Sequence, residues 1–315
     1  VPLCTKIRQA QAKRIGVESL KFYDQNVNFP DGDAIPKGST QDKIQNAQKM
    51  YEDMSAETGE FFRSMVQREL LDLESKKGKA MGGYCTYIPN EEAPFIFSNF
   101  NGTSGDVDVL THEAGHAFQA YCSRDYKLVA YRNPTNEACE IHSMSMEFFA
   151  CPYMDLFFGE KADKYRFAHL SDAVTFVPYG VMVDHFQHEV YANPDMTPDE
   201  RKALWSSLEK RYQPHLDYDG SEIMEKGVYW LRQLHIFMYP FYYIDYTLAS
   251  MSAFEFYGLM KEDRKKAWEK YVALCKLGGS KSYLDLLAAV GLTSPFAEGA
   301  VEKIVRPLID ELEIK

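Results

Sequence analysis

The amino-acid sequence predicts a mainly helical fold with a single small β segment. Apolar residues recur at intervals of three and four through most of the 315 residues, which is the spacing of helices with one buried face. Alternating, β-prone residues occur convincingly only between residues 81 and 100. The helix expected directly after them carries two histidines four residues apart. These observations predict a helical protein built around one small sheet or hairpin.

The region before this β segment is expected to be helical, apart from one loop. Residues 1–20 have the pattern of a short amphipathic helix, and residues 29–38 are a loop dense in Pro, Gly and Asp. A long helical stretch begins at Thr40, with Gly59 as a candidate break. We expect this stretch to end at residues 76–78, where two lysines precede a glycine that can cap a helix.

Two β-prone runs form the predicted β segment. They cover residues 81–88 and 94–100, and residues 89–93 between them have the composition of a hairpin loop. Gly82 and Gly83 interrupt the first run. Glycines in a strand indicate either the close approach of another backbone, here a bound peptide added as an extra strand, or a bulge. The sequence leaves both interpretations open.

A histidine pair marks the next helix. Residues four apart lie on one face of an α-helix, so His112 and His116 can direct their imidazoles at one ion. Glu113 stands beside the first histidine, where a carboxylate can reach a water at the metal. This H-E-x-x-H pattern is typical of zinc peptidases, with the glutamate as general base. The alternative is a chance pair on an amphipathic helix.

The surroundings of the histidine pair favour the metal-binding interpretation. A β-prone run, a Gly-rich turn and a helix follow one another, and Thr103 with Asp106 fits a capping box at the helix start. Such a strand, turn and helix are what a zincin needs. The helix has an apolar stripe that we expect to be buried, made of Val107, Leu110, Ala114, Ala117 and Phe118.

A catalytic zinc site needs a third protein ligand. The zincins that use a third histidine on the same segment are excluded, because Gln119 and Cys122 occupy the matching positions. A glutamate from a second helix is the alternative, and the candidates share the segment after Thr135: Glu137, Glu140 and Glu147. Glu140 and Glu147 lie on one helical face, so Glu140 can bind the ion while Glu147 orients a ligand histidine.

Composition and charge narrow the class of protein. The formal net charge of −11 argues against a nucleic-acid partner, and no run approaches the length of a membrane span. No signal peptide is recognisable, and the six cysteines are scattered, so we expect reduced thiols and a cytoplasmic protein. The chain begins at Val1, as a fragment or a processed product would.

Several segments together resemble the oligoendopeptidase F and thimet oligopeptidase group of zinc metallopeptidases, with the oligoendopeptidase F branch closer. The resemblance covers most of residues 20–300. The segments that carry it are residues 99–116, Glu140 followed by Glu147, and residues 184–194, 197–201 and 235–246.

The resemblance implies a fold, a cofactor and roles. It implies one zinc ion held by His112, His116 and Glu140, with Glu113 as the base. It also implies a mainly helical, zincin-like catalytic lobe with the small sheet or hairpin beside the active-site helix. Family members enclose short peptides between two lobes and usually carry a long helical N-terminal region. By comparison we expect most of that region to be missing from this chain, and a separate chain supplying the N-terminal lobe is an expected partner.

A late aromatic cluster is the predicted source of oxyanion donors. His235, Tyr239, Tyr243 and Tyr246 would share one face of a helix that Pro240 kinks. By resemblance, a histidine and tyrosines of this region face the zinc and hydrogen-bond the developing oxyanion, with His235 and Tyr246 favoured. A kink at Pro240 can shift the helical alignment by one position, so Tyr242 is an alternative to Tyr243 as the residue that faces the zinc. The other interpretation of these tyrosines is packing in the core.

The predicted protein is therefore a zinc-dependent endopeptidase that hydrolyses short unstructured peptides. Two alternatives stay open: an exopeptidase that releases dipeptides, and a non-catalytic fragment that binds peptides. We expect residues 1–315 to be a single catalytic domain, which is helical over about residues 1–78, β over 79–102, and helical with the zinc site over 103–315.

Overall fold

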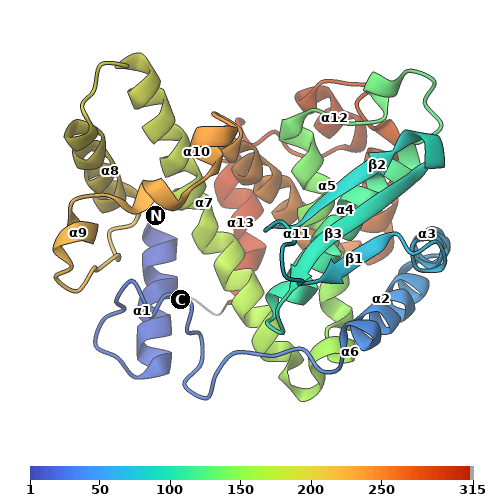
Figure 1. The fold of residues 1–315 in the computed structure, drawn as a ribbon, viewed down its shortest axis with the longest axis horizontal. Coiled ribbons are helices and arrows are strands. Elements are labelled where there is room, and N and C mark those ends of the chain that lie inside the picture. Colours follow the sequence, from blue (N-terminus) through green and yellow to red (C-terminus); the bar gives the residue numbers. More distant parts are fainter. Residues whose placement is uncertain (313–315) are drawn as a thin grey trace. The chain divides into compact units, whose positions relative to one another are not determined.

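The computed structural model describes residues 1–312 (Figure 1). These residues fall into two compact units. The sheet unit comprises residues 34–166 and 249–307, and the Trp205 unit comprises residues 1–33, 167–248 and 308–312. Helices dominate, and one small sheet is present, so the predicted fold class is confirmed. The helical prediction for residues 313–315 lies outside the described residues.

The sheet has three strands in the order β1-β3-β2 (Figure 1). The predicted hairpin is confirmed, because β2 (Tyr84–Ile88) runs antiparallel to β3 (Ala93–Phe100). A 3₁₀ turn, η1 (Pro89–Glu91), closes it, and Glu92 follows with φ of 49°. Every side chain of β3 is buried or partly buried, and the two classes alternate after Ala93. The strand is central in the sheet, and one of its faces packs on α4.

The prediction of helix over the first 78 residues is wrong over residues 16–28, which form a loop, and again after residue 67. Residues Leu71–Glu74 form strand β1, which pairs in parallel with β3. The alternation of apolar and acidic residues in this short segment has the period of a strand, and Leu73 is its buried residue. The helix therefore does not continue to residues 76–78.

The long helical stretch is divided at Ser55 rather than at Gly59. It consists of α2 (Thr40–Met54) and α3 (Ala56–Gln67). Ser55 has an extended backbone, and its side chain accepts a hydrogen bond from the Thr58 amide, which caps α3. Gly59 lies inside α3, where a Cβ would approach Glu52 Cα to 3.0 Å, so the glycine permits the close crossing of the two helices.

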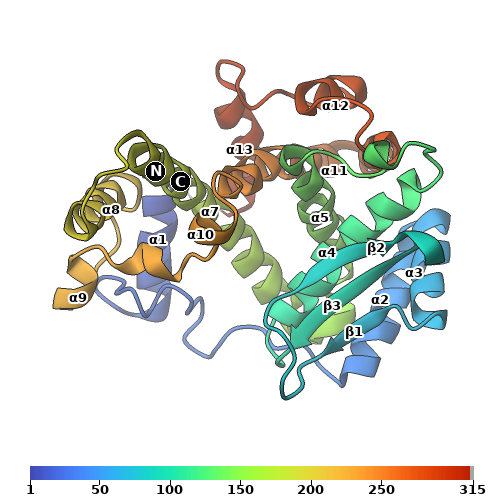
Figure 2. The ribbon, with the colours of Figure 1, turned by 45° about the horizontal axis from the view of Figure 1, so that its top comes forward.

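Helix α4 (Gly105–Ser123), which carries the histidine pair, packs between the sheet and α5 (Asn136–Ala150). Figures 1 and 2 show this place of the helix in the ribbon. The predicted buried stripe is confirmed, because all five of its apolar residues are fully buried. The capping box is wrong. The Asp106 carboxylate instead accepts hydrogen bonds from the amides of Asn101 and Gly102, and it lies 3.5 Å from Lys43 Nζ. Asp106 thus holds the turn before α4.

The Trp205 unit has its own core. Helix α7 (Ala162–Ala192), from residue 167 onward, packs with α8 (Pro198–Tyr212) around the fully buried Trp205. Helix α1 (Pro2–Ile15) confirms the predicted N-terminal helix. Segments after α8 also pack against this core, through residues that include Tyr229, Trp230, Ile236 and Tyr243.

The remaining elements are mostly short. Helix α11 (Tyr243–Leu277) is the long exception, and its backbone departs from helical geometry at Asp263. No helix within residues 1–312 is both long and apolar enough to cross a membrane. The others are α6 (Asp155–Phe158), α9 (Glu222–Glu225), α10 (His235–Met238), α12 (Tyr283–Val290), α13 (Ala300–Glu311), η2 (Val129–Tyr131), η3 (Cys151–Tyr153), η4 (Gly159–Lys161) and η5 (Tyr229–Arg232).

Candidate active site

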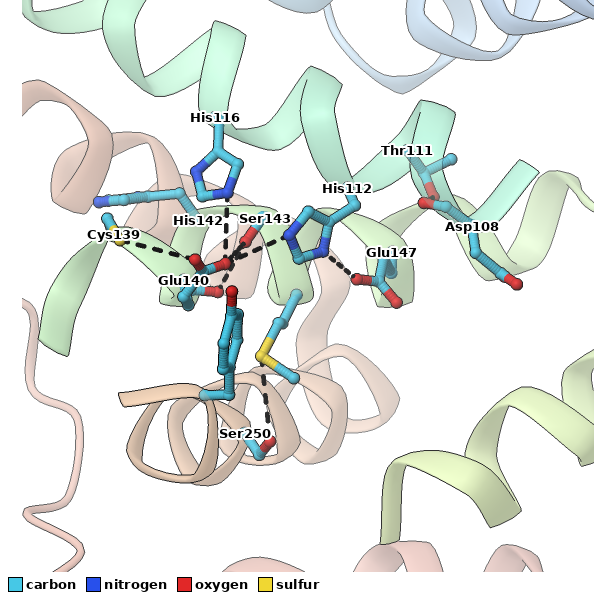
Figure 3. Close-up of polar contacts among 12 residues, drawn as sticks. Asp108, Thr111, His112, His116, Cys139, Glu140, His142, Ser143, Glu147 and Ser250 are labelled. Atoms are coloured by element: carbon cyan, nitrogen blue, oxygen red, sulfur yellow. Dashed lines mark hydrogen bonds and ion pairs between the residues drawn. The ribbon is translucent and has the colours of Figure 1, made fainter. Parts of the chain in front are cut away.

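Helices α4 and α5 bring three potential metal ligands together (Figure 3). His112 and His116 project from successive turns of α4, and Glu140 projects toward them from α5. The Nε2 atoms of both histidines lie 3.2 Å from Glu140 Oε2. One donor atom from each of the three residues falls within 4.8 Å of the others. Within residues 1–312, these three residues are the one group of His, Cys, Asp or Glu side chains placed closely enough to hold a metal ion.

The donor set fits zinc in chemistry and in spacing. Two imidazole nitrogens and a carboxylate oxygen are ligands that zinc prefers at catalytic sites. Donor atoms about 2.1 Å from a tetrahedral ion lie about 3.4 Å from each other. The two separations of 3.2 Å between imidazole nitrogen and carboxylate oxygen are close to that value. The arrangement can therefore accept the ion without rebuilding either helix.

The electrostatics of the cluster are those of a cation site. Burial alone would lower the pKa of His112, but hydrogen bonds with Glu140 and Glu147 raise it well above its ordinary value. Burial alone would raise the pKa of Glu140, but His116 and His112 hold it well below its ordinary value. A proton on the His112 imidazole thus occupies the place that a metal cation takes, and metal binding at such sites displaces protons.

Further side chains orient the candidate ligands. Glu147 Oε1 lies 2.6 Å from His112 Nδ1, as the shared helical face predicts, and this contact leaves Nε2 for the ion. Ser143 Oγ donates to Glu140 Oε2 over 2.9 Å. Ser143 was not among the predicted site residues, although its position three residues after Glu140 on the same helix face was a usable signal.

Gly115 sets the distance between α4 and α5. A Cβ at this position would lie 2.6 Å from both His142 O and Ser143 Cα, closer than real Cβ atoms approach backbone. The glycine lets the two helices cross at the level of the histidine pair, which brings Glu140 within reach. Its place inside the H-E-A-G-H segment, where a larger residue would serve the helix better, was the available signal.

Glu113 is a buried carboxylate without a hydrogen bond. Its side chain is 7% exposed, and no group within residues 1–312 donates to it. Burial raises the pKa of the Glu113 carboxyl, while His112 and His116 lower it. A Cβ on Gly83 would lie 3.6 Å from Glu113 Oε1, so the chain entering β2 passes beside this carboxylate. A carboxylate in this position is available to accept a proton from a small molecule.

The predicted aromatic cluster lies in the Trp205 unit, and its helical description is wrong. Helix α10 ends at Met238, and Tyr239 has a non-helical backbone. Tyr239 is 60% exposed and makes no ring contact with the cluster within the described residues. Helix α11 begins anew at Tyr243, after Pro240 and Phe241, whose φ is 64°. The four aromatic residues therefore do not share one continuous helical face.

The remaining members do come together around His235. The centroid of its ring lies 5.1 Å from that of Tyr243, 5.8 Å from Tyr246 and 6.3 Å from Tyr242. Tyr246 OH lies 3.5 Å from His235 Nε2. The Tyr243 ring also contacts Phe176 and Tyr179 of α7, which favours a packing role for it. The contribution of each tyrosine to catalysis stays a prediction.

The fold and the donor set define a class of protein. A mainly helical fold with a small sheet beside the H-E-x-x-H helix, and a glutamate approaching from a second helix, is the arrangement of zincin-like metallopeptidases. The model of peptidase family M3 matches residues 5–306. The chain belongs to this family, in the oligoendopeptidase F branch.

Individual relatives agree with this assignment. The chain is 26% identical to oligopeptidase PepF of Bacillus subtilis over 273 residues, which cover 82% of this chain and 40% of the relative. It is 26% identical to an oligoendopeptidase F homolog of Borreliella burgdorferi over 301 residues, which cover 93% of this chain and 50% of the relative. The solved structure of PZ peptidase A with an inhibitor has a TM-score of 0.96 at 57% identity, covering 99% of this chain and 56% of that one. The chain thus spans about half the length of these relatives.

Proposed function

We propose that the chain is the catalytic part of a zinc-dependent endopeptidase that hydrolyses short unstructured peptides. The observation that carries this proposal is the convergence of His112, His116 and Glu140 beside the unpartnered carboxylate of Glu113. Membership of peptidase family M3 supports the same class of reaction. Short peptides are the proposed substrates, and a separate chain that supplies the family's N-terminal lobe is a proposed partner.

Each catalytic group has a role that follows from its chemistry. His112, His116 and Glu140 would hold one zinc ion, which supplies Lewis-acid polarisation of the scissile carbonyl and the attacking water. Glu113 accepts a proton from that water and returns it to the leaving amine. His235 and Tyr246 donate hydrogen bonds to the oxyanion, and Tyr243 is the weaker candidate for that role. Tyr239, which is largely exposed, is the weakest.

Strand β2 offers a place for the substrate backbone. One of its edges pairs with β3, and no other strand of the described chain pairs with the opposite edge. A peptide added along that edge would pass the glycines before β2 and reach the carboxylate of Glu113. We also propose that residues 1–315 act as a single catalytic domain, because the proposed reaction uses residues of both units. The proposed location of this domain is the cytoplasm.

The choice of third ligand is tested by metal analysis. We expect the parent protein and Glu137→Ala to retain zinc through gel filtration, because Glu137 lies in the first turn of α5 and away from the donor set. Glu140→Ala should weaken zinc binding by more than the roughly hundredfold that loss of an outer partner costs. Zinc retained by Glu140→Ala and lost from Glu137→Ala would reverse the assignment.

The reaction itself is tested with blocked peptides. An internally quenched peptide of about ten residues, acetylated and amidated at its ends, is a substrate for an endopeptidase and not for an enzyme that needs a free terminus. We expect zinc-dependent cleavage of this peptide at an internal bond, identified by mass spectrometry. Cleavage only of unblocked peptides would favour the dipeptide-releasing exopeptidase. Binding without cleavage of either form would favour the non-catalytic alternative.

A further inference from the structure

Tyr179 and Gln233 form a hydrogen-bonded chain that ends on His235, within the Trp205 unit. We call this chain the relay. Tyr179 OH donates to Gln233 Oε1 over 2.9 Å. Gln233 Nε2 lies 2.7 Å from His235 Nδ1. The relay therefore runs from α7 through the residue that follows η5 to the start of α10. It ends on the imidazole nitrogen opposite the one that faces Tyr246.

The phenol of Tyr179 determines which way the Gln233 amide points. A carboxamide accepts hydrogen bonds only through its oxygen and donates only through its nitrogen. Tyr179 has no other acceptor for its hydroxyl proton among residues 1–312. With Oε1 on the phenol, the NH₂ group of Gln233 faces His235. In the flipped orientation the phenol proton would lose its acceptor in a partly buried place, which is unfavourable.

The orientation of the amide determines the tautomer of His235. Because Gln233 presents a donor, His235 Nδ1 has to be the acceptor. A neutral imidazole carries one proton, so that proton is on Nε2. The imidazolium would place a second N–H against the amide donor and is disfavoured for the same reason. His235 is thus held with an Nε2–H group, which can donate to an oxyanion.

Packing holds the relay in place. The Tyr179 ring contacts Trp205 and Tyr243, and it belongs to the margin of the Trp205 core. On the other side, Trp230 of η5 packs on Phe186 of the same core, with ring centroids 5.1 Å apart. Tyr179 and the segment just before Gln233 therefore both pack on the same core. This is the condition under which an outer hydrogen bond can fix the orientation of a catalytic group.

We propose that Gln233, oriented by Tyr179, is a positioning residue that fixes His235 as the neutral Nε2–H tautomer. The importance of this tautomer for catalysis rests on the proposed function, in which His235 donates to the oxyanion. The 3.5 Å between His235 Nε2 and Tyr246 OH agrees with it, because two donors at this separation can direct their protons at one oxygen. Neither Tyr179 nor Gln233 touches the reacting atoms in this scheme.

The tautomer can be measured directly. In the zinc-loaded protein labelled with ¹⁵N-histidine, long-range proton–nitrogen correlation spectra separate protonated from unprotonated ring nitrogens. The His235 signals are assigned by their absence from His235→Ala. We expect Nδ1 unprotonated and Nε2 protonated in the parent. Gln233→Glu replaces the donor by an acceptor, so the Nδ1 signal should move to the protonated position. Gln45→Glu, the same change at an exposed position of α2, should leave the spectrum unaltered.

Kinetics on the blocked peptide supply the second measurement. Gln233→Leu removes the orienting donor, and we expect kcat to fall about tenfold with little change in KM. A protonated Nδ1 in the parent, or an Nδ1 signal that Gln233→Glu does not move, would overturn the inference. The two claims can fail separately. If the spectra are as expected but His235→Ala keeps the kcat of the parent, the relay is confirmed and the oxyanion role of His235 is refuted.

Discussion

Glu113→Gln is expected to retain zinc and to lose nearly all turnover. The amide has the shape of the carboxylate but cannot accept the proton of the attacking water at neutral pH, and loss of a general base typically lowers the rate by about a hundred- to ten-thousandfold. The residue makes no hydrogen bond within residues 1–312 that the substitution would break. The fall should appear in kcat, measured on the blocked peptide at saturating zinc, with KM nearly constant.

Stability measurements separate this catalytic effect from a folding defect. Burial raises the pKa of the Glu113 carboxyl, so its charged form is disfavoured where it stands. A neutral amide should therefore leave the Tm unchanged or raise it. Glu137→Gln, the same substitution near the start of α5, serves as the matched control and should keep full activity. If the kcat of Glu113→Gln is within tenfold of that of the parent, Glu113 is not the general base.

Local geometry made the central part of the site predictable from the sequence. The positions of His112, Glu113 and His116 on one helix follow from helical periodicity, and so does the burial of the apolar stripe on the opposite side of α4. The contact between Glu147 and His112 followed from the spacing of Glu140 and Glu147 on α5. Each of these predictions starts from the spacing of residues along one helix.

Features that depend on distant partners were not predictable in the same way. Strand β1 exists because Leu71, Asp72 and Glu74 pair with residues of β3 that lie 25 or 26 positions later in the chain. Gly115 matters because α4 and α5 cross there, and no periodicity in either helix reports that crossing. Tertiary contacts decide such features, and a single sequence shows only the residues that permit them.

The error at Tyr239 has a local cause that the sequence did contain. Proline restricts the residue before it to extended conformations and donates no amide hydrogen bond, so Pro240 ends a helix more readily than it bends one. Tyr239 accordingly has φ of −138° and ψ of 68°, and α10 stops one residue earlier. The amide of Phe241 bonds to Gln187 of α7 instead of a helical carbonyl. The break turns the later tyrosines toward His235 without a shared helix.

Tyr246→Phe is the second substitution with a large expected effect. It removes only a hydroxyl, and that hydroxyl lies 3.5 Å from His235 Nε2. A donor that bonds the oxyanion but hardly touches the ground-state peptide stabilises the transition state alone, so its loss lowers kcat with little change in KM. Loss of one such donor typically costs about 3 kcal/mol, or roughly a hundredfold in rate.

A packing role for Tyr246 predicts a different outcome. The ring stays in Tyr246→Phe and keeps its contacts with Tyr242 and Tyr243, so a packing residue would give near-normal kcat and at most a small change in Tm. Tyr191→Phe removes the same group from an exposed ring on α7 and should behave as the parent. His235→Ala should repeat the loss in kcat, because both donors would serve one oxyanion. A Tyr246→Phe protein whose loss lies entirely in KM would return this tyrosine to the packing role, since only a transition-state contact confines the effect to kcat.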